Sequence, residues 1–447
     1  MGCGRLMVTH MVIARGGGIP GTGIRRSPFA FVLAALVVVA AACGPSAPPT
    51  PNPDGSVNLR IGFTASRTGS LEVTSLKQVK GLETWAADVR AAGGIHLADG
   101  RVLMPQLVSY DDESRTDRVQ ALYQKLINTD RVDVLVSPYS SGLIKAAAVV
   151  SEQNGKVMIT AGGADDATMS QGFTGIYQVY TPASAYLEGA IDLALALDPT
   201  IHRIAIVNEK DAFSTSVADA AGPYATAKGL EVVLDEGYDS GTTDFGPFLN
   251  KIAAASPDAI IGGGHLADGQ TLARQLTEKQ VPARFVALLV APPDPTFAKI
   301  GDAALGVVGP SQWEPSVGYS AEAAAALGIP YVGPTVAEFT AAYKAATGAA
   351  PTYHAAGGYA AGLVLAAAIE RAGSTDTAAV EQALDGLDVM TFFGHLRFSG
   401  DQRTHGKQIA HQMVYVQWQR AVDGTLHTVV VWPQEAATVA AQLRTTP

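Results

Sequence analysis

Short apolar runs alternate with longer amphipathic segments along the chain from Val57 onward. The short runs are rich in β-branched residues and predict strands at 59–64, 102–110, 134–136, 156–160, 203–207, 231–238, 259–262 and 284–289. The longer segments repeat apolar residues every three or four positions and predict helices at 75–92, 115–128, 142–153, 185–197, 214–228, 245–255 and 269–279. This alternation is typical of parallel sheets covered by helices.

The strand-helix units fall into two similar sets, separated by a pause near Tyr180-Thr181-Pro182. We therefore expect an α/β fold with two doubly wound lobes, each built on a parallel sheet. In such sheets ligands bind beyond the carboxyl ends of the strands. With two sheets facing each other, the expected site is the crevice between the lobes.

Composition supports a folded chain of more than one domain and excludes some partners. The chain has 447 residues, of which 47% are hydrophobic and 16% charged. The formal net charge of -10 is spread along the chain, and no block of Lys and Arg is long enough to follow a phosphate backbone. Nucleic-acid binding is not expected.

The N-terminal segment, residues 1–43, has the order of a secretory signal. Arg25 and Arg26 precede an apolar run over 29–42, which ends in small residues directly before Cys43. The run is shorter than the ~20 residues of a membrane span, so we expect export rather than a permanent transmembrane helix. Ala-Ala-Cys-Gly resembles a bacterial lipobox, which implies lipidation of Cys43; an ordinary cleaved signal is the alternative. The Pro-rich stretch 44–56 is typical of a spacer.

Motifs for catalysis or cofactor binding do not stand out. The two cysteines, Cys3 and Cys43, both lie in or at the edge of the targeting segment. The acidic run 111–113 is interpreted as a solvated turn, because it follows a predicted strand and has arginines nearby. The nine histidines form no zinc-protease pair, and the sequence carries neither a phosphate-binding loop nor a Gly-x-Ser-x-Gly elbow. We expect no enzyme activity, no cofactor and no metal.

Several short stretches in a fixed order carry a more specific likeness. They are Ile61-Gly62-Phe63, Thr68-Gly69-Ser70, Gly93-Gly94-Ile95, Tyr110-Asp111-Asp112, Tyr139-Ser140-Ser141-Gly142, Val157-Met158-Ile159-Thr160, Arg203 to Val207, Asp244-Phe245 and Gly306 to Gly309. From Leu59 to about Trp418 the chain resembles the type I periplasmic binding proteins of the leucine/isoleucine/valine-binding family, which serve ABC importers.

The resemblance implies two lobes joined by a three-crossover hinge, with a cleft that closes on ligand. We expect crossovers near Ala183, Pro310 and Ile409. The first lobe is then expected to comprise residues 57–183 and 311–408, and the second lobe residues 184–310 and 409–447. An ABC importer permease is the implied membrane partner, and a monomer is the expected state.

Candidate ligand-binding residues lie at the ends of predicted strands. Ser140 and Ser141 precede a predicted helix, where a hydroxyl can cap the helix while backbone N–H groups point into the cleft. The resemblance implies that Ser140 and the loop of Gly162, Gly163 and Ala164 hold a ligand carboxylate. The alternative for Ser140 is a helix cap alone.

The resemblance places four further residues at the cleft. It puts Phe213 over the ligand, and it puts His265 and Thr74 where relatives often carry tyrosines. For His265 the alternative is a surface or structural histidine. Trp313 is a candidate stacking plate for the ligand, with packing at the hinge as the alternative.

Departures from the family pattern bear on the ligand. Leu289 and the segment 183–185 stand where many amino-acid-binding relatives carry an acidic residue. A buried ammonium without a carboxylate costs several kcal/mol. We therefore expect a ligand with a carboxylate or amide but no α-ammonium, unless Glu209 or Asp211 supplies the charge. The chain is predicted to be an extracytoplasmic solute-binding lipoprotein anchored through Cys43; a ligand-sensing receptor component is the alternative.

Overall fold

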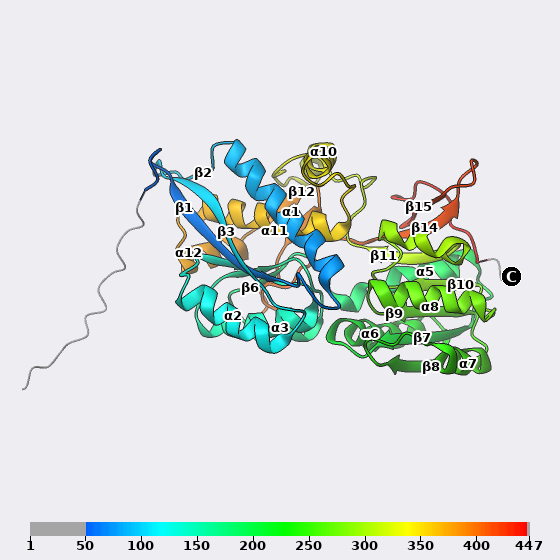
Figure 1. The fold of residues 1–447 in the computed structure, drawn as a ribbon. Helices are drawn as coiled ribbons and strands as arrows, with labels where there is room; N and C mark the ends of the chain where they lie inside the picture. Colours follow the sequence, from blue (N-terminus) through cyan, green and yellow to red (C-terminus); the bar gives the residue numbers. More distant parts are fainter. Residues whose placement is uncertain (1–50, 445–447) are drawn as a thin grey trace, which may run out of the picture. The chain divides into compact units, whose positions relative to one another are not determined.

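The computed structural model describes residues 51–444, and the unit Pro49–Pro447 forms one compact body. The predicted signal segment, with Cys43, and residues 44–50 of the predicted spacer lie outside the described residues. Figure 1 shows two sheets with their helices, coloured in chain order. We call the two halves built on these sheets the first and the second lobe.

The first lobe contains a six-stranded sheet with the strand order β2-β3-β1-β4-β5-β6. Its strands are β1 (Val57–Ala65), β2 (Ile95–His96), β3 (Val102–Asp111), β4 (Val134–Val136), β5 (Met158–Thr160) and β6 (Ile176–Gln178). All neighbours are parallel except β2 with β3. Because β1 lies between β3 and β4, the chain winds outward in both directions from β1, and the crevice at this switch point opens toward the expected site.

The second lobe contains a seven-stranded sheet with the strand order β15-β14-β11-β10-β9-β7-β8. Its strands are β7 (Arg203–Glu209), β8 (Glu231–Tyr238), β9 (Ala259–Gly263), β10 (Phe285–Leu288), β11 (Val307–Ser311), β14 (Val414–Arg420) and β15 (Leu426–Trp432). The strands from β7 to β11 pair in parallel, and β14 and β15 add an antiparallel edge. The switch point here lies at β7, which pairs with both β8 and β9.

Helices cover both sheets. The helices are α1 (Glu72–Ala91), α2 (Thr116–Asn128), α3 (Ser141–Gln153), α4 (Asp166–Met169), α5 (Glu188–Leu197), α6 (Ala212–Ala227), α7 (Gly246–Ala255), α8 (Leu266–Glu278), α9 (Ala321–Leu327), α10 (Val336–Thr347), α11 (Tyr353–Ala372) and α12 (Thr377–Asp385), with 3-10 segments η1 (Ala183–Ala185) and η2 (Pro295–Ala304). In Figure 1, α1 and α11 lie on one side of the first sheet and α2 and α3 on the other.

Alternation along the strands explains why both faces of each sheet are covered. In β4, Val134 and Val136 belong to the apolar cluster under α1 and α11, whereas Leu135 packs with residues of α2 and α3. Successive strand residues point to opposite faces, so a continuous apolar run needs a helical layer on each side. The two-lobed α/β fold with mainly parallel sheets, predicted from the alternation, is confirmed.

The chain between β11 and β14 packs against the first lobe rather than the second. Helix α11 lies against α1, and two glycines make this close crossing possible. A Cβ at Gly81 would lie 1.9 Å from the carbonyl oxygen of Ala355, and a Cβ at Gly358 would lie 2.0 Å from that of Gln78. Side chains at these two positions would separate the helices. This segment also contains the hairpin of β12 (Asp388–Thr391) and β13 (Gly394–Arg397).

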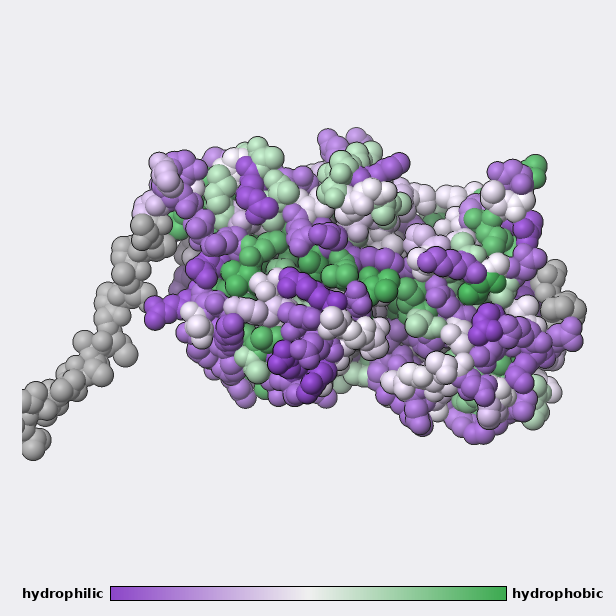
Figure 2. All heavy atoms as spheres, viewed as in Figure 1, coloured by the Kyte–Doolittle hydropathy of each residue, from purple (hydrophilic) through white to green (hydrophobic). Residues whose placement is uncertain are grey.

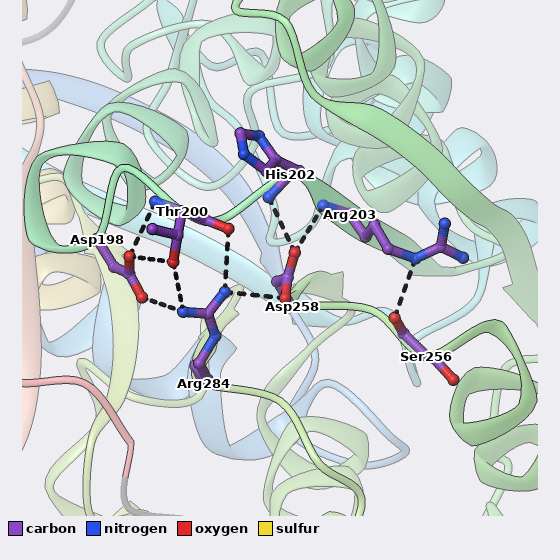
Figure 3. A network of polar contacts seen from close by, with 7 residues as sticks. All are labelled: Asp198, Thr200, His202, Arg203, Ser256, Asp258 and Arg284. Carbon is purple, nitrogen blue, oxygen red and sulfur yellow. Dashed lines mark hydrogen bonds and ion pairs between the residues drawn. The ribbon is translucent and has the colours of Figure 1, made fainter.

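A polar network ties together the amino ends of three strands in the second lobe (Figure 3). The guanidinium of Arg284 donates to the carboxylate of Asp258 at 2.9 Å and also pairs with Asp198. Asp258 in turn accepts from the backbone N–H of Arg203 at 2.9 Å. Because parallel strands have their carboxyl ends at the opposite edge, this network stabilises the end of the sheet away from the expected site.

Polar residues cover most of the face drawn in Figure 2, and apolar residues gather in a band across its middle. Among residues 51–444, none of the helices combines the length and the hydrophobicity that a membrane span requires.

Candidate ligand-binding site

A pocket lies where loops from the carboxyl ends of both sheets meet. Its lining is largely aromatic: Tyr139, Ser140, Ser141, Gly162, Gly163, Ala164, Tyr180, Tyr186, Phe213, His265, Val290, Tyr353 and His354. We call it the inner pocket. Its volume is about 10 Å³, the space of roughly one water molecule. The two lobes are thus closed over it, and a larger ligand requires them to separate.

Ser140 and Ser141 lie at the start of α3 but make different contacts. Ser140 occupies the N-cap position in an extended conformation, and its hydroxyl makes no capping hydrogen bond. The hydroxyl oxygen of the fully buried Ser141 accepts from the backbone N–H groups of Ala164 at 3.1 Å and Asp165 at 3.3 Å. Ser141 therefore fixes the loop after β5, whereas Ser140 presents a hydroxyl without a capping role at the pocket.

The glycines of the loop after β5 are packed against the first lobe itself. A Cβ at Gly162 would lie 2.1 Å from Oε1 of Gln78, and a Cβ at Gly163 would lie 2.6 Å from Cδ1 of Ile144. Gln78 and Ile144 therefore leave no room for a side chain at Gly162 and Gly163, whether or not a ligand is bound. Ala164 can offer a ligand only its backbone N–H and its carbonyl. The N–H already donates to the hydroxyl oxygen of Ser141.

Phe213 is positioned by the cap of α6. The carboxylate of Asp211 accepts from the N–H groups of Phe213 at 2.7 Å and Ser214 at 2.9 Å, which holds the first turn of the helix. The ring of Phe213 packs edge-on against Tyr186, with centroids 5.1 Å apart, and lies 6.0 Å from the ring of His265. The resemblance placed Phe213 and His265 separately at the cleft, and the structure brings their rings together in the lining of one pocket.

His265 connects the two lobes. Its Nδ1 lies 2.9 Å from the hydroxyl of Tyr139, and its Nε2 lies 3.1 Å from Oδ2 of Asp211. Burial alone would lower the pKa of His265, but the hydrogen bond and charge of Asp211, together with Glu209 and Asp268, raise it to about 9. At neutral pH the ring is therefore an imidazolium that donates to both neighbours.

The second histidine of the pocket, His354, favours the neutral form, whereas His265 favours the charged form. His354 is buried and stacks on Tyr353 with centroids 3.9 Å apart. Burial, with the nearby charges of Lys77 and His265, lowers the pKa of His354 well below its usual value. The inner pocket thus combines one cationic and one neutral imidazole within an aromatic wall.

A larger chamber adjoins the inner pocket and shares Tyr139 and His265 with it. Its volume is about 390 Å³, and we call it the outer chamber. The first lobe lines it with Ser70, Leu71, Val73 and Thr74, and the second lobe lines it with Glu209, Gly241, Thr242, Thr243, Leu266, Ala267, Asp268, Gln270, Thr271, Thr296 and Lys299. Thr74 therefore lies here rather than in the inner pocket.

Trp313 reaches neither cavity. It is fully buried, its Nε1 donates to the carbonyl of Phe392 at 3.0 Å, and its ring packs edge-on against Phe339 and Phe392. Of the two interpretations that the sequence left open, the structure supports packing rather than stacking on a ligand.

Sequence reasoning missed most of the aromatic wall. Tyr139 directly precedes the predicted Ser140, and Tyr180 and Tyr186 lie in or near the pause between the two strand-helix sets. Their closeness to predicted site and crossover positions could have identified these tyrosines. Tyr353 and His354 begin α11, far along the chain from both sets. Only the folded arrangement of α11 against α1 brings them to the pocket.

Three side chains of the second lobe could hold a cation. One donor atom each from Glu209, Asp211 and His265 lies within 4.8 Å of the other two. The Asp211 carboxylate and Nε2 of His265 already bind each other, and Asp211 also caps α6. A metal ion would have to displace these contacts. The geometry therefore does not favour a metal site at these three residues.

Comparison with known proteins places this geometry in context. The family described as "Periplasmic binding protein" matches residues 58–424. A Brucella suis protein named "Leu/Ile/Val-binding protein homolog 7" is 25% identical over 406 residues, covering 86% of this chain and 93% of the relative. A Pseudomonas aeruginosa "Amino acid binding protein" is 25% identical over 233 residues, covering 51% of this chain and 59% of the relative.

Solved structures share the fold at low sequence identity. The substrate-binding protein LivJ from Streptococcus pneumoniae, in complex with isoleucine, has a TM-score of 0.66 at 20% identity, covering 84% of this chain and 100% of that chain. A solute-binding protein from Rhodopseudomonas palustris in complex with 3,4-dihydroxybenzoic acid has a TM-score of 0.68 at 21% identity, covering 87% and 99%. A second protein from that organism, in complex with benzoate, has a TM-score of 0.68 at 18% identity, covering 86% and 98%.

Proposed function

Because this chain belongs to the periplasmic binding protein family, we propose that it is an extracytoplasmic solute-binding lipoprotein that captures a small ligand between its lobes and delivers it to an ABC importer. The family likeness predicted from the sequence is confirmed, and so is the prediction that the chain is not an enzyme, because the family consists of substrate-binding proteins. The ligand, the anchor and the importer are parts of the proposal.

The observation that carries the proposal is the inner pocket. Its residues come from loops at the carboxyl ends of both sheets, and Tyr139 of the first lobe touches His265 of the second. A ligand that contacts both walls holds the lobes together around it, with the walls farther apart than in the ligand-free arrangement described here. The signal for the importer is then the closed, loaded form.

We propose a ligand that carries a carboxylate or amide but no α-ammonium. The start of α3 offers the Ser140 hydroxyl and a helix N-terminus for a negative or acceptor group. Leu289 and Ala183 are buried apolar residues that cannot neutralise an ammonium. Solved structures of the same fold include complexes with benzoate and with 3,4-dihydroxybenzoic acid, two acids without an ammonium group.

The remaining parts of the proposal concern location and partners. We propose that Cys43 is lipidated, that residues 44–56 space the body from the membrane, and that the chain acts as a monomer beside an ABC importer permease. We propose residues 57–183 and 311–408 as the first lobe and residues 184–310 and 409–447 as the second. Incorporation of labelled palmitate into the full chain, lost in the Cys43→Ser variant, tests the anchor.

The ligand is tested by a thermal-shift screen of the Pro49–Pro447 unit against amino acids, amides, urea, aromatic acids and short peptides. A ligand that binds only the native state raises the melting temperature by mass action. We expect stabilisation by acids or amides that lack an ammonium group. Stabilisation by leucine, isoleucine or valine instead contradicts the proposed ligand class, and stabilisation by no member of the panel contradicts it as well.

A further inference from the structure

The outer chamber contains a buried carboxylate oxygen without a partner. Glu209, the last residue of β7, is 8% exposed, and its Oε2 makes no hydrogen bond. A buried charged group that lacks a hydrogen bond costs several kcal/mol. Since Glu209 lines the chamber, the missing partner has room to enter from the cleft.

A second buried carboxylate faces the same small space. Asp268, in the first turn of α8, is 9% exposed and accepts from the hydroxyl of Tyr238. Its Oδ2 and the Oε2 of Glu209 each lie 2.4 Å from the position that a Cβ at Gly264 would occupy. Because residue 264 has no side chain, both oxygens can lie against its Cα, within about 5 Å of each other.

The charges around this point do not balance. Glu209, Asp211 and Asp268 are opposed by the single imidazolium of His265, whose Nε2 already pairs with Asp211. Burial raises the pKa of Glu209 and that of Asp268. A cation of suitable geometry beside these two carboxylates would offset the cost of burying their charge.

We propose that Glu209 and Asp268 form a subsite for the amine or guanidinium group of the ligand, reached through the outer chamber. This inference rests on the proposed function and extends it: the ligand is an acid or amide without an α-ammonium but with a cationic group at its far end. An organic cation is favoured over a metal ion because it binds Glu209 without displacing the contact between Asp211 and His265. Besides His265, the chamber lining contains one basic side chain, the exposed Lys299.

The test compares three probes that differ only in their end groups: butanoate, 4-guanidinobutanoate and butylguanidinium. Each is titrated by calorimetry into the Pro49–Pro447 unit as wild type, as Glu209→Gln, and as Glu236→Gln. Glu236 is a matched control, because it lies on β8, pairs with Lys251 at the surface and lines neither cavity. Melting curves of each variant confirm that it is folded, and Asp268→Asn provides a second variant in the subsite.

We expect the wild type to bind both guanidinium probes at least about 10-fold more tightly than butanoate, and Glu209→Gln to lose about 10-fold to 100-fold for these two probes alone. Glu236→Gln should match the wild type. If butanoate does not bind but butylguanidinium binds in a Glu209-dependent manner, the carboxylate part of the proposed function fails and this inference stands. Equal affinities for butanoate and 4-guanidinobutanoate, or an unchanged Glu209→Gln variant, overturn it. The inference is also overturned if Zn²⁺ stabilises the protein in a Glu209-dependent manner while the guanidinium probes do not stabilise it.

Discussion

The hydroxyl of Tyr139 lies 2.9 Å from Nδ1 of His265, and this contact joins the first lobe to the second. Both residues line the inner pocket and the outer chamber. A second contact between the lobes pairs Lys77 of α1 with Asp294, which follows β10. The side chains that join the two lobes therefore neighbour those of the proposed ligand site.

The charge of His265 should make stability depend on pH. Its folded pKa of about 9 exceeds the usual value of 6.5, so its contribution is complete below about pH 6.5 and is lost as pH rises through 9. We expect the free energy of unfolding to fall by about 2 to 3 kcal/mol between pH 7 and 9.5, measured by urea denaturation.

The variant His265→Gln separates this effect from other titrations. Glu314, whose pKa burial raises to about 7, changes stability mainly below that range, and the buried tyrosines titrate above pH 10. The variant should show a much shallower profile between pH 7 and 9.5 than the wild type. A profile as steep as that of the wild type would assign the titration to another group.

The ion pair between Lys77 and Asp294 should favour the closed form. Lys77 is 22% and Asp294 4% exposed, so this pair is better shielded than a surface pair. We expect Lys77→Met to increase the radius of gyration measured by small-angle scattering and to weaken ligand binding about 3-fold to 10-fold. The control is Lys80→Met, one turn along α1, whose exposed pair with Glu83 lies within the same helix. Identical scattering and affinity in both variants would contradict a role in closure.

The adjacent serines should separate stability from binding. Ser141→Ala leaves the N–H groups of Ala164 and Asp165 without their acceptor, so we expect a loss of about 1 to 2 kcal/mol in the free energy of unfolding. Ser140→Ala removes a hydroxyl without a capping bond, so we expect a change below about 0.5 kcal/mol but at least about 5-fold weaker ligand binding. Denaturation and calorimetry on both variants check this, and the reverse pattern would assign the ligand contact to Ser141.

The packing of Gly163 should make that position intolerant of a side chain. A Cβ there would lie 2.6 Å from Cδ1 of Ile144 and 2.9 Å from the backbone nitrogen of Ser141. We expect Gly163→Ala to cost about 1 to 3 kcal/mol in the free energy of unfolding. Gly142→Ala is the control, because no atom within 4 Å opposes its Cβ and alanine favours the helix; it should be neutral or stabilising. Equal effects at both positions would contradict the packing account.

The parallel part of the fold was predictable because most of its strands are short runs rich in β-branched residues that alternate with helical segments. The ranges 134–136 and 231–238 match β4 and β8 residue for residue. The segment after Pro310 was not predicted in detail. Strands β14 and β15 are antiparallel edge strands with mixed polar content, and α9 to α12 follow β11 without intervening strands of the main sheets.

The site was predictable where it follows a strand directly. Ser140, Gly162, Phe213 and His265 all stand just after strands, and the structure places them around one pocket. Among the tyrosines of the wall, Tyr139 lies in the loop after β4, whereas Tyr180 and Tyr186 lie between β6 and α5. Tyr353 begins α11, whose position depends on packing against α1. The role of Trp313 could not be predicted from its residue type, because a large aromatic ring suits stacking on a ligand and packing in the core equally well.

The most direct test of the account is a calorimetric titration of the Pro49–Pro447 unit with leucine and with 4-methylpentanoate, which is leucine without its α-amino group. Leu289 and Ala183, which stand where the resemblance implies an acidic residue, cannot neutralise an ammonium. We therefore predict that 4-methylpentanoate binds at least about 10-fold more tightly than leucine. Micromolar or tighter binding of leucine, with weaker binding of 4-methylpentanoate, would contradict the account.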